Sequence, residues 1–272
     1  MEQKFIDIAG IRIAYVEKNK NSLNTIFFIH GNSGSSRTLL KQLNDECFNN
    51  FRLIALDMPG HGHSSASTNP LHEYSLPVTG KIIAEAITNI CMDRPFCMIG
   101  FSYGTNVLAE SLNYAINPNG IILIAPCIAG AGYGLDKIFK AGGTPIFFSD
   151  EFDLPTVKNF YTNELKHSVK DDIDFFVQDF TGVKPPFRSS LIQTVGAGNF
   201  SDEILIVKKN IPVLVLFGNE DSLLNIDYLD NADLKFWKKK VYKIPGAGHF
   251  VQNDQPVIIN RILSEYLDSC FK

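Results

Sequence analysis

Five short, almost continuously apolar runs recur along the chain, and segments with helical patterns lie between several of them. The runs are Thr25–His30, Arg52–Leu56, Phe96–Gly100, Ile121–Ala125 and Pro212–Gly218. Strands that lack polar alternation are typical of a parallel sheet covered on both faces. The helical patterns cover Val78–Asn89, Tyr103–Ile116 and Val257–Cys270. This succession of strands and helices predicts the α/β class, in which helices flank a mostly parallel sheet.

Two further features complete the expected sheet. Lys4–Ile8 and Ile11–Val16 flank Ala9-Gly10 and predict a hairpin at the N-terminus. Lys240–Ile244 predicts a last strand near the C-terminus. We expect the sheet to belong to one structural core, which is interrupted once along the sequence.

The interruption runs from residue 126 to residue 202. This segment has no clear strand, and it holds ten of the 21 phenylalanines between glycine-rich and proline-rich pieces. Leu154–His167 and Val169–Asp179 predict helices within it. Because strands resume afterwards, we interpret residues 126–202 as a helical cap inserted between core residues 1–125 and 203–272.

Charge and composition narrow the class of partner. The net charge is −4, the pI is about 5.9, and the chain has no long basic run, so nothing favours nucleic-acid binding. The five cysteines form no CxxC pair and do not predict a disulfide framework. No signal-peptide pattern or membrane-length apolar run is present. We therefore expect a cytoplasmic protein without membrane attachment, either a monomer or a small homo-oligomer.

The stretch Gly100-Phe101-Ser102-Tyr103-Gly104 lies where an apolar strand passes into a helical pattern. Gly-x-Ser-x-Gly at such a junction is typical of a nucleophile elbow, a tight turn that exposes a serine hydroxyl at the carboxyl edge of a sheet. The N-terminus of the following helix favours negative charge that develops nearby. The alternative is a plain glycine turn with a solvent-facing serine. The context favours Ser102 as a nucleophile.

A serine nucleophile needs a base, and the base needs an acid to orient it. Asp221 follows the strand Pro212–Gly218, and His249 lies in a loop of small residues before the last helix. Loops at the carboxyl ends of parallel strands converge, so Ser102, Asp221 and His249 are predicted to meet as a catalytic triad. Glu220 stays open as the acid. His249 could instead be a structural loop histidine, although the other histidines fit the base role less well.

Two more motifs bear on the chemistry. Backbone N–H groups of Tyr103 and of Asn32, in the loop His30–Ser36, are the predicted oxyanion-hole donors. His61-Gly62-His63 could form half of a metal site, but Ser64-Ser65-Ala66 follows without further ligands. We therefore predict no metal site and no cofactor.

These motifs together resemble the α/β-hydrolase superfamily. They are HGNSGSS at 30–36, DMPGHGHS at 57–64, GFSYG at 100–104, FGNED at 217–221 and PGAGHF at 245–250. The resemblance implies an α/β-hydrolase fold with an eight-stranded, mostly parallel sheet and a variable cap over the site. It also implies that Ser102 is the nucleophile, Asp221 the acid and His249 the base.

Further stretches resemble the serine-dependent N-acyl-homoserine lactonases of that superfamily. They include HGNSGSS, GLDKIFKAGG, GAGNFSDEI and DYLDNADLKFWKKKVYKIPGAGH. The chain departs from these lactonases at the acid, where they have glutamate and this chain has Asp221. The resemblance implies hydrolysis of an ester or lactone through an acyl-enzyme, with ring opening of N-acyl-homoserine lactones (quorum quenching) as the expected reaction.

Expectations about substrate contacts concern the loop after the first parallel strand and the cap. We expect Gly31, Phe147, Phe160 and Tyr161 to bind substrate, with Phe160 competing with Tyr161 for one position. The alternative for each aromatic residue is that it joins the cap to the sheet. A carboxylesterase for small acyl esters is the enzymatic alternative, and a ligand-binding protein on the same fold is the non-enzymatic one.

Overall fold

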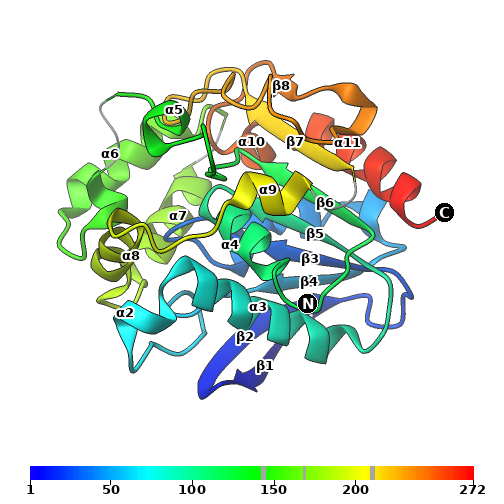
Figure 1. The fold of residues 1–272 in the computed structure, drawn as a ribbon, viewed down its shortest axis with the longest axis horizontal. Coiled ribbons are helices and arrows are strands. Elements are labelled where there is room, and N and C mark those ends of the chain that lie inside the picture. The colour runs from blue at the N-terminus through cyan, green and yellow to red at the C-terminus, as the bar shows by residue number, and fades with distance from the viewer. Residues whose placement is uncertain (142–144, 168–169, 209–211) are drawn as a thin grey trace.

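The computed structural model describes residues 1–141, 145–167, 170–208 and 212–272. An eight-stranded sheet runs through the molecule in the order β1-β2-β4-β3-β5-β6-β7-β8 (Figure 1). The strands are β1 (Glu2–Ile8), β2 (Ile11–Lys18), β3 (Thr25–Ile29), β4 (Arg52–Leu56), β5 (Phe96–Phe101), β6 (Gly120–Ile124), β7 (Val213–Gly218) and β8 (Tyr242–Ile244). Every predicted strand is present, with bounds that differ by a few residues.

Pairing in the sheet changes from antiparallel to parallel after β2. Strands β1 and β2 form the predicted hairpin, and β2 also pairs antiparallel with β4. Ala9 and Gly10 both have positive φ, as a two-residue hairpin turn requires. All pairs from β4 through β8 are parallel, so the carboxyl ends of these strands share one edge of the sheet.

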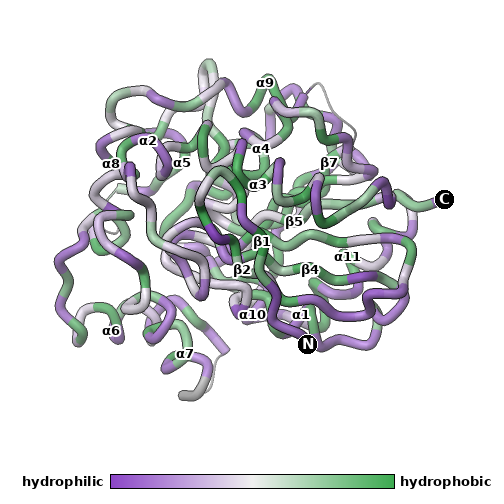
Figure 2. Tube along the Cα trace, turned by 90° about the horizontal axis from the view of Figure 1, so that it is seen from below, coloured by the Kyte–Doolittle hydropathy of each residue, from purple (hydrophilic) through white to green (hydrophobic). Residues whose placement is uncertain are grey.

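Helices cover both faces of the sheet. Helices α3 (Leu76–Cys91), α4 (Tyr103–Ser111) and α9 (Glu203–Lys208) lie on one face, and α1 (Leu40–Leu43), α10 (Val251–Asp254) and α11 (Pro256–Cys270) lie on the other (Figure 1). The structure also has the short helices α2 (Pro70–Glu73), η1 (Ser36–Leu39), η2 (Glu46–Phe48) and η4 (Trp237–Lys239). Strands β3 to β7 are buried along their whole length, which explains their continuous apolar sequences. Figure 2 shows hydrophobic residues along these central strands.

Between β6 and β7 the chain leaves the sheet and forms α5 (Leu135–Ile138), η3 (Pro145–Phe148), α6 (Leu154–Glu164), α7 (Lys170–Thr181) and α8 (Phe187–Gly196) before α9. We call residues 126–202 the inserted segment. Helices α6 and α7 match the two predicted there, although Val169 lies outside the described residues. Whether this segment is a separate unit from residues 1–125 and 203–272 stays a prediction.

Several helices differ from the sequence prediction. Helix α4 ends at Ser111 rather than Ile116, because the N–H groups of Asn113 and Tyr114 bond three residues back and begin the turn toward β6. Helices α8 and α9 were not predicted, and neither were the four-residue helices α1, α2, α5 and α10. The α8 sequence is rich in serine and threonine, and it is held by packing of Phe187 and Leu191 against its surroundings, not by local preference.

Candidate active site

Ser102 lies at a sharp turn between β5 and α4. Its φ of 51° is in the left-handed region, which few residues other than glycine adopt. A Cβ at Gly104 would lie 2.4 Å from the backbone oxygens of Ile29 and His30, and one at Gly100 would lie 2.7 Å from the oxygen of Gly104. The two glycines of the motif are thus required by the close approach of backbone to backbone.

The structure brings Ser102, His249 and Asp221 together from loops after β5, β8 and β7. His249 Nε2 lies 3.0 Å from Ser102 Oγ, and His249 Nδ1 lies 2.8 Å from Asp221 Oδ2. The other carboxylate oxygen, Asp221 Oδ1, accepts the N–H groups of Leu223 and Leu224 at 2.8 and 3.0 Å. Glu220, the alternative acid, is exposed to solvent. The three side chains have the geometry of a Ser-His-Asp triad.

The charge of Asp221 is held in place by its partners. Burial alone would raise the pKa of this carboxyl, but the neighbouring His249 and the two backbone N–H groups outweigh burial. The net effect lowers the pKa of Asp221 below its ordinary value. An ionised Asp221 can therefore accept from Nδ1 of His249, which leaves Nε2 to accept the proton of Ser102.

The predicted oxyanion donors lie beside Ser102. Tyr103 begins α4 directly after it, and Asn32 follows β3, the neighbour of β5 in the sheet. Gly31 approaches so closely that a Cβ there would be 3.2 Å from Cβ of Ser102. Within the described residues, the backbone N–H groups of Asn32 and Tyr103 have no protein acceptor. Both are available to an oxyanion, and that role remains a prediction.

Side chains from distant segments fix the Asn32 loop. The amide Nδ2 of Asn32 donates to the carbonyl oxygen of Phe147 at 2.9 Å, and Ser33 Oγ donates to Asn32 Oδ1 at 2.7 Å. Buried Arg188, on α8, donates from Nε to Ser33 Oγ at 2.9 Å. The inserted segment thus holds the loop at two points.

The histidines of the neighbouring loops are structural. His30 Nε2 accepts the N–H of Met58 at 3.0 Å, and His61 Nε2 accepts the N–H of Ser33 at 3.3 Å. Burial lowers the pKa of both imidazoles, which keeps them neutral. His63 is exposed. Among the residues that the structure describes, no group of three His, Cys, Asp or Glu side chains could hold a metal ion.

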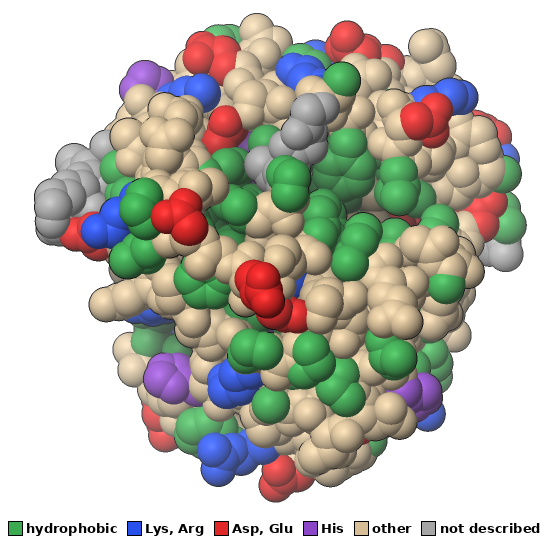
Figure 3. Space-filling view, turned by 90° about the vertical axis from the view of Figure 1, so that its left-hand side faces the viewer, with side chains coloured by type: hydrophobic (Ala, Val, Ile, Leu, Met, Phe, Trp, Pro, Cys, Tyr) green, Lys and Arg blue, Asp and Glu red, His purple; other side chains and the backbone are tan. Residues whose placement is uncertain are grey.

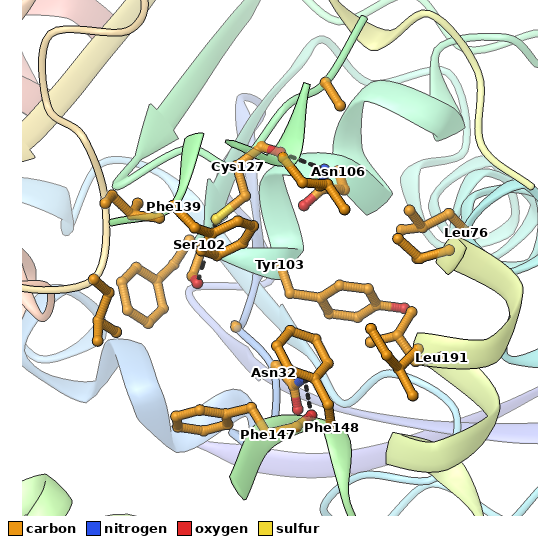
Figure 4. A pocket seen from close by; sticks show the side chains of 18 of the residues that line it. Asn32, Leu76, Ser102, Tyr103, Asn106, Cys127, Phe139, Phe147, Phe148 and Leu191 are labelled. Atoms are coloured by element: carbon orange, nitrogen blue, oxygen red, sulfur yellow. Dashed lines mark hydrogen bonds between the residues drawn. The ribbon is translucent and has the colours of Figure 1, made fainter. Parts of the chain in front are cut away.

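A cavity of about 210 Å³ opens beside Ser102 and His249 (Figure 4). Its wall is mostly apolar and includes Leu76, Phe139, Phe147, Phe148, Leu191 and Ile192. Figure 3 shows hydrophobic side chains gathered on the face of the molecule that carries the inserted segment. The arrangement can hold a small, largely apolar acyl compound with a carbonyl group at Ser102.

The expected substrate contacts divide into two pairs. Gly31 and Phe147 line the cavity. Phe160 and Tyr161 do not line it: Phe160 packs edge-to-face on Phe147, and Tyr161 is 1% exposed and stacks on Phe176. Phe160 and Tyr161 therefore pack against other aromatic side chains, which agrees with the alternative interpretation of these two residues.

Sequence reasoning missed two polar residues at this site. Asn106 lies on α4 four residues after Ser102 and lines the cavity. Glu203 begins α9 and is fully buried behind Asn106, to which it is hydrogen bonded. The spacing of Asn106 places it on the same helix face as Ser102, and this was the one signal available. Nothing in the sequence linked Glu203 to the site.

This chain matches a known protein family and is similar in sequence to known proteins. A family model described as the alpha/beta hydrolase family matches residues 26–262. The chain is 24% identical over 97% of its length to the dihydrolipoyllysine-residue acetyltransferase component of the acetoin cleaving system of Cupriavidus necator, of which it covers 68%. No helix among the described residues is long and apolar enough to cross a membrane.

Two solved structures are similar over nearly their whole length. One is a mutant of the N-acyl homoserine lactonase AidH in complex with N-hexanoyl homoserine lactone, with a TM-score of 0.90 and 19% identity, covering 100% of this chain and 99% of that one. The other is an esterase from a Rhodococcus species, with a TM-score of 0.79 and 21% identity, covering 99% and 100%. At these identities the likeness shows the fold alone. It confirms the predicted fold class.

Proposed function

Because the chain belongs to the alpha/beta hydrolase family, we propose that it is a serine hydrolase of carboxylic esters or lactones. The observation that carries the proposal is the chain of contacts from Ser102 Oγ through His249 to Asp221, at 3.0 and 2.8 Å. Ser102 and His249 line a cavity whose walls are mostly apolar. A Ser-His-Asp triad beside such a cavity supports acyl transfer without a cofactor.

The reaction proceeds in two steps. Ser102 Oγ attacks the carbonyl carbon while His249 Nε2 takes the hydroxyl proton, and Asp221 stabilises the resulting imidazolium. The N–H groups of Asn32 and Tyr103 bind the oxyanion. His249 then gives the proton to the leaving alkoxide, and an acyl-enzyme remains on Ser102. Water, deprotonated by His249, attacks the acyl carbon, and His249 returns the proton to Ser102 Oγ as the bond to the acyl group breaks and the acid leaves.

Within this class we propose ring opening of N-acyl-homoserine lactones. The resemblance of sequence stretches within the inserted segment and on both sides of it supports this proposal, as does the similarity of the whole fold to a lactonase. In a lactone the alkoxide and the acyl group belong to one molecule, so a single hydroxy acid is released. A carboxylesterase for small acyl esters is the second candidate. It is favoured by Asp221, which stands where the lactonases have glutamate.

The test is mass spectrometry of products from a panel of N-acyl-homoserine lactones, beside a short-chain nitrophenyl ester. Gain of one water with the amide intact, reversed by acidification, supports lactonase action. Free fatty acid with homoserine lactone would mean that the amide is cleaved instead. Turnover of the nitrophenyl ester alone would assign the protein to the carboxylesterases.

A matched pair of variants tests the nucleophile. Ser102→Ala is expected to lower kcat by at least about 10³-fold, because it removes the hydroxyl that forms the acyl-enzyme. Ser264→Ala, on α11 and distant from the cavity, serves as the control and should retain activity. An organophosphonate should label the wild type at Ser102. Failure to label, together with absence of turnover, would support the ligand-binding alternative.

A further inference from the structure

The side-chain amide of Asn106 is the feature that the proposed mechanism leaves unused. Asn106 is 8% exposed, and it lines the cavity one helical turn after Ser102 on α4. Two residues four apart on a helix lie on the same face, about 6 Å apart. Whatever Asn106 contacts in a bound substrate is therefore only a few bonds from the carbonyl carbon at Ser102.

The orientation of this amide is determined by its partners. Nδ2 donates to the backbone carbonyl oxygen of Cys127 at 2.8 Å and to Glu203 Oε2 at 2.7 Å. A backbone carbonyl can only accept, so the NH₂ group must face Cys127. The carbonyl oxygen Oδ1 then faces the cavity, as Figure 4 shows. No donor from the described part of the chain reaches Oδ1 within hydrogen-bond distance.

Glu203 fixes this arrangement from behind. Its Oε2 also accepts the N–H of Ala129 at 2.8 Å, so Asn106 and the chain after β6 are attached to the same oxygen. Burial raises the pKa of Glu203 to about 8, which keeps the carboxyl neutral at pH 7. The wall behind Asn106 therefore brings no net charge to the cavity.

Of the other polar side chains that line the cavity, Tyr103 has a hydroxyl that is buried away from the open space and has no partner among the described residues, and Asn32 and Ser102 are paired. Asn32 is bonded to Phe147 and Ser33, and Ser102 is bonded to His249. Oδ1 of Asn106 thus stands as a fixed acceptor in a wall that is otherwise largely apolar. A substrate that displaces water from Oδ1 without offering a donor leaves the oxygen unpaired, which lowers affinity.

We propose that Asn106 is a specificity-determining residue whose Oδ1 accepts a hydrogen bond from an N–H group of the substrate. The preferred substrate then carries an amide N–H within a few bonds of the ester or lactone carbonyl. N-acylated α-amino esters and lactones have this chemistry, and simple acyl esters do not. The inference rests on the proposed ester or lactone hydrolysis and specifies its substrate class.

The test uses two nitrophenyl esters that differ only at the donor. In N-hexanoylglycine nitrophenyl ester an N–H stands two bonds from the ester carbonyl carbon. In 4-oxononanoic acid nitrophenyl ester a CH₂ replaces it. For the wild type we expect kcat/KM to favour the N–H substrate by about 10- to 100-fold, because a site built for a donor discriminates against its absence.

Variants locate the discrimination. In Asn106→Ala the preference should fall to within about threefold, through loss of kcat/KM for the N–H substrate. Leu76→Ala removes apolar wall from the same cavity and should leave the ratio unchanged. The wild-type ratio requires no variant, so the inference can be judged even if Asn106→Ala fails to fold.

Each outcome decides one point. Equal turnover of the two esters by the wild type would overturn the role of Asn106 and leave the proposed hydrolysis standing. A preference that persists in folded Asn106→Ala would assign N–H recognition to another group and overturn the inference. Absence of turnover of both esters would overturn the proposed function, and the inference with it.

Discussion

Asp221 and Glu220 are neighbours in sequence with opposite surroundings. Asp221 is 1% exposed and accepts three hydrogen bonds, whereas the side chain of Glu220 lies in solvent. We expect Asp221→Asn to lower kcat about 10⁴-fold, because the amide favours the wrong imidazole tautomer. Glu220→Gln is the matched control and should keep activity within about twofold. Measurement of kcat on the preferred ester decides between the two acids, and a large loss in Glu220→Gln would reverse the assignment.

At the residue scale the sequence indicated some positions and was silent on others. Ser102, Asp221 and His249 follow strands whose ends must share an edge, so their meeting could be predicted from order alone. The contact between Asn106 and Glu203 could not, because α9 follows the inserted segment and its packing on α4 is tertiary. Phe160 and Tyr161 were placed by resemblance, and packing in the inserted segment places them behind Phe147.

The turn between β5 and α4 depends on two close backbone contacts. Gly104→Ala would place a Cβ 2.4 Å from the oxygens of Ile29 and His30, which cannot move without disturbing β3. We expect the free energy of unfolding to fall by about 2–4 kcal/mol. Urea denaturation followed by circular dichroism measures the change.

Gly196→Ala, at the end of α8, is the control for Gly104→Ala. No atom lies within 4 Å of a Cβ there, and the residue is helical. We expect this variant to gain about 0.4–1 kcal/mol, since alanine reduces the freedom of the unfolded chain. A Gly104→Ala protein as stable as the wild type would show that β3 and α4 can separate, and it would contradict the account of the motif.

Elements of the sheet were easier to predict than those of the inserted segment. Continuous apolar runs such as those of β5 and β7 arise only where both faces are covered, so sequence alone identifies them. Helix α8 has a weaker pattern, and its burial of Phe187 and Leu191 depends on α2 and α3, which come from another part of the chain.

For the whole molecule, Glu203 links stability to pH. Its pKa in the folded protein is about 8, above the ordinary value of 4.5, so folding favours the protonated form. This contribution is complete below pH 4.5 and is lost as the pH rises through 8. Between pH 6.5 and 8.0 the free energy of unfolding should fall by about 2 kcal/mol, at about 1.4 kcal/mol per pH unit.

Chemical denaturation at pH 6.5 and at pH 8.0 measures this slope. In Glu203→Gln the slope should largely disappear, because the amide oxygen can still accept from Asn106 and Ala129 and no longer titrates. Glu46→Gln, which changes an exposed glutamate, should keep the wild-type slope. A slope that survives in Glu203→Gln would place the titrating group elsewhere.

The two attachments of the Asn32 loop, to Phe147 and through Ser33 to Arg188, have a consequence for protein engineering. A chimera that exchanges residues 126–202 for the corresponding segment of another hydrolase would replace the walls that select a substrate. It would also remove the anchors of the loop whose Asn32 N–H is the proposed oxyanion donor. If the proposed site is correct, exchange of this segment changes selectivity and turnover together, and recombination at these boundaries must transplant the loop with the segment that holds it.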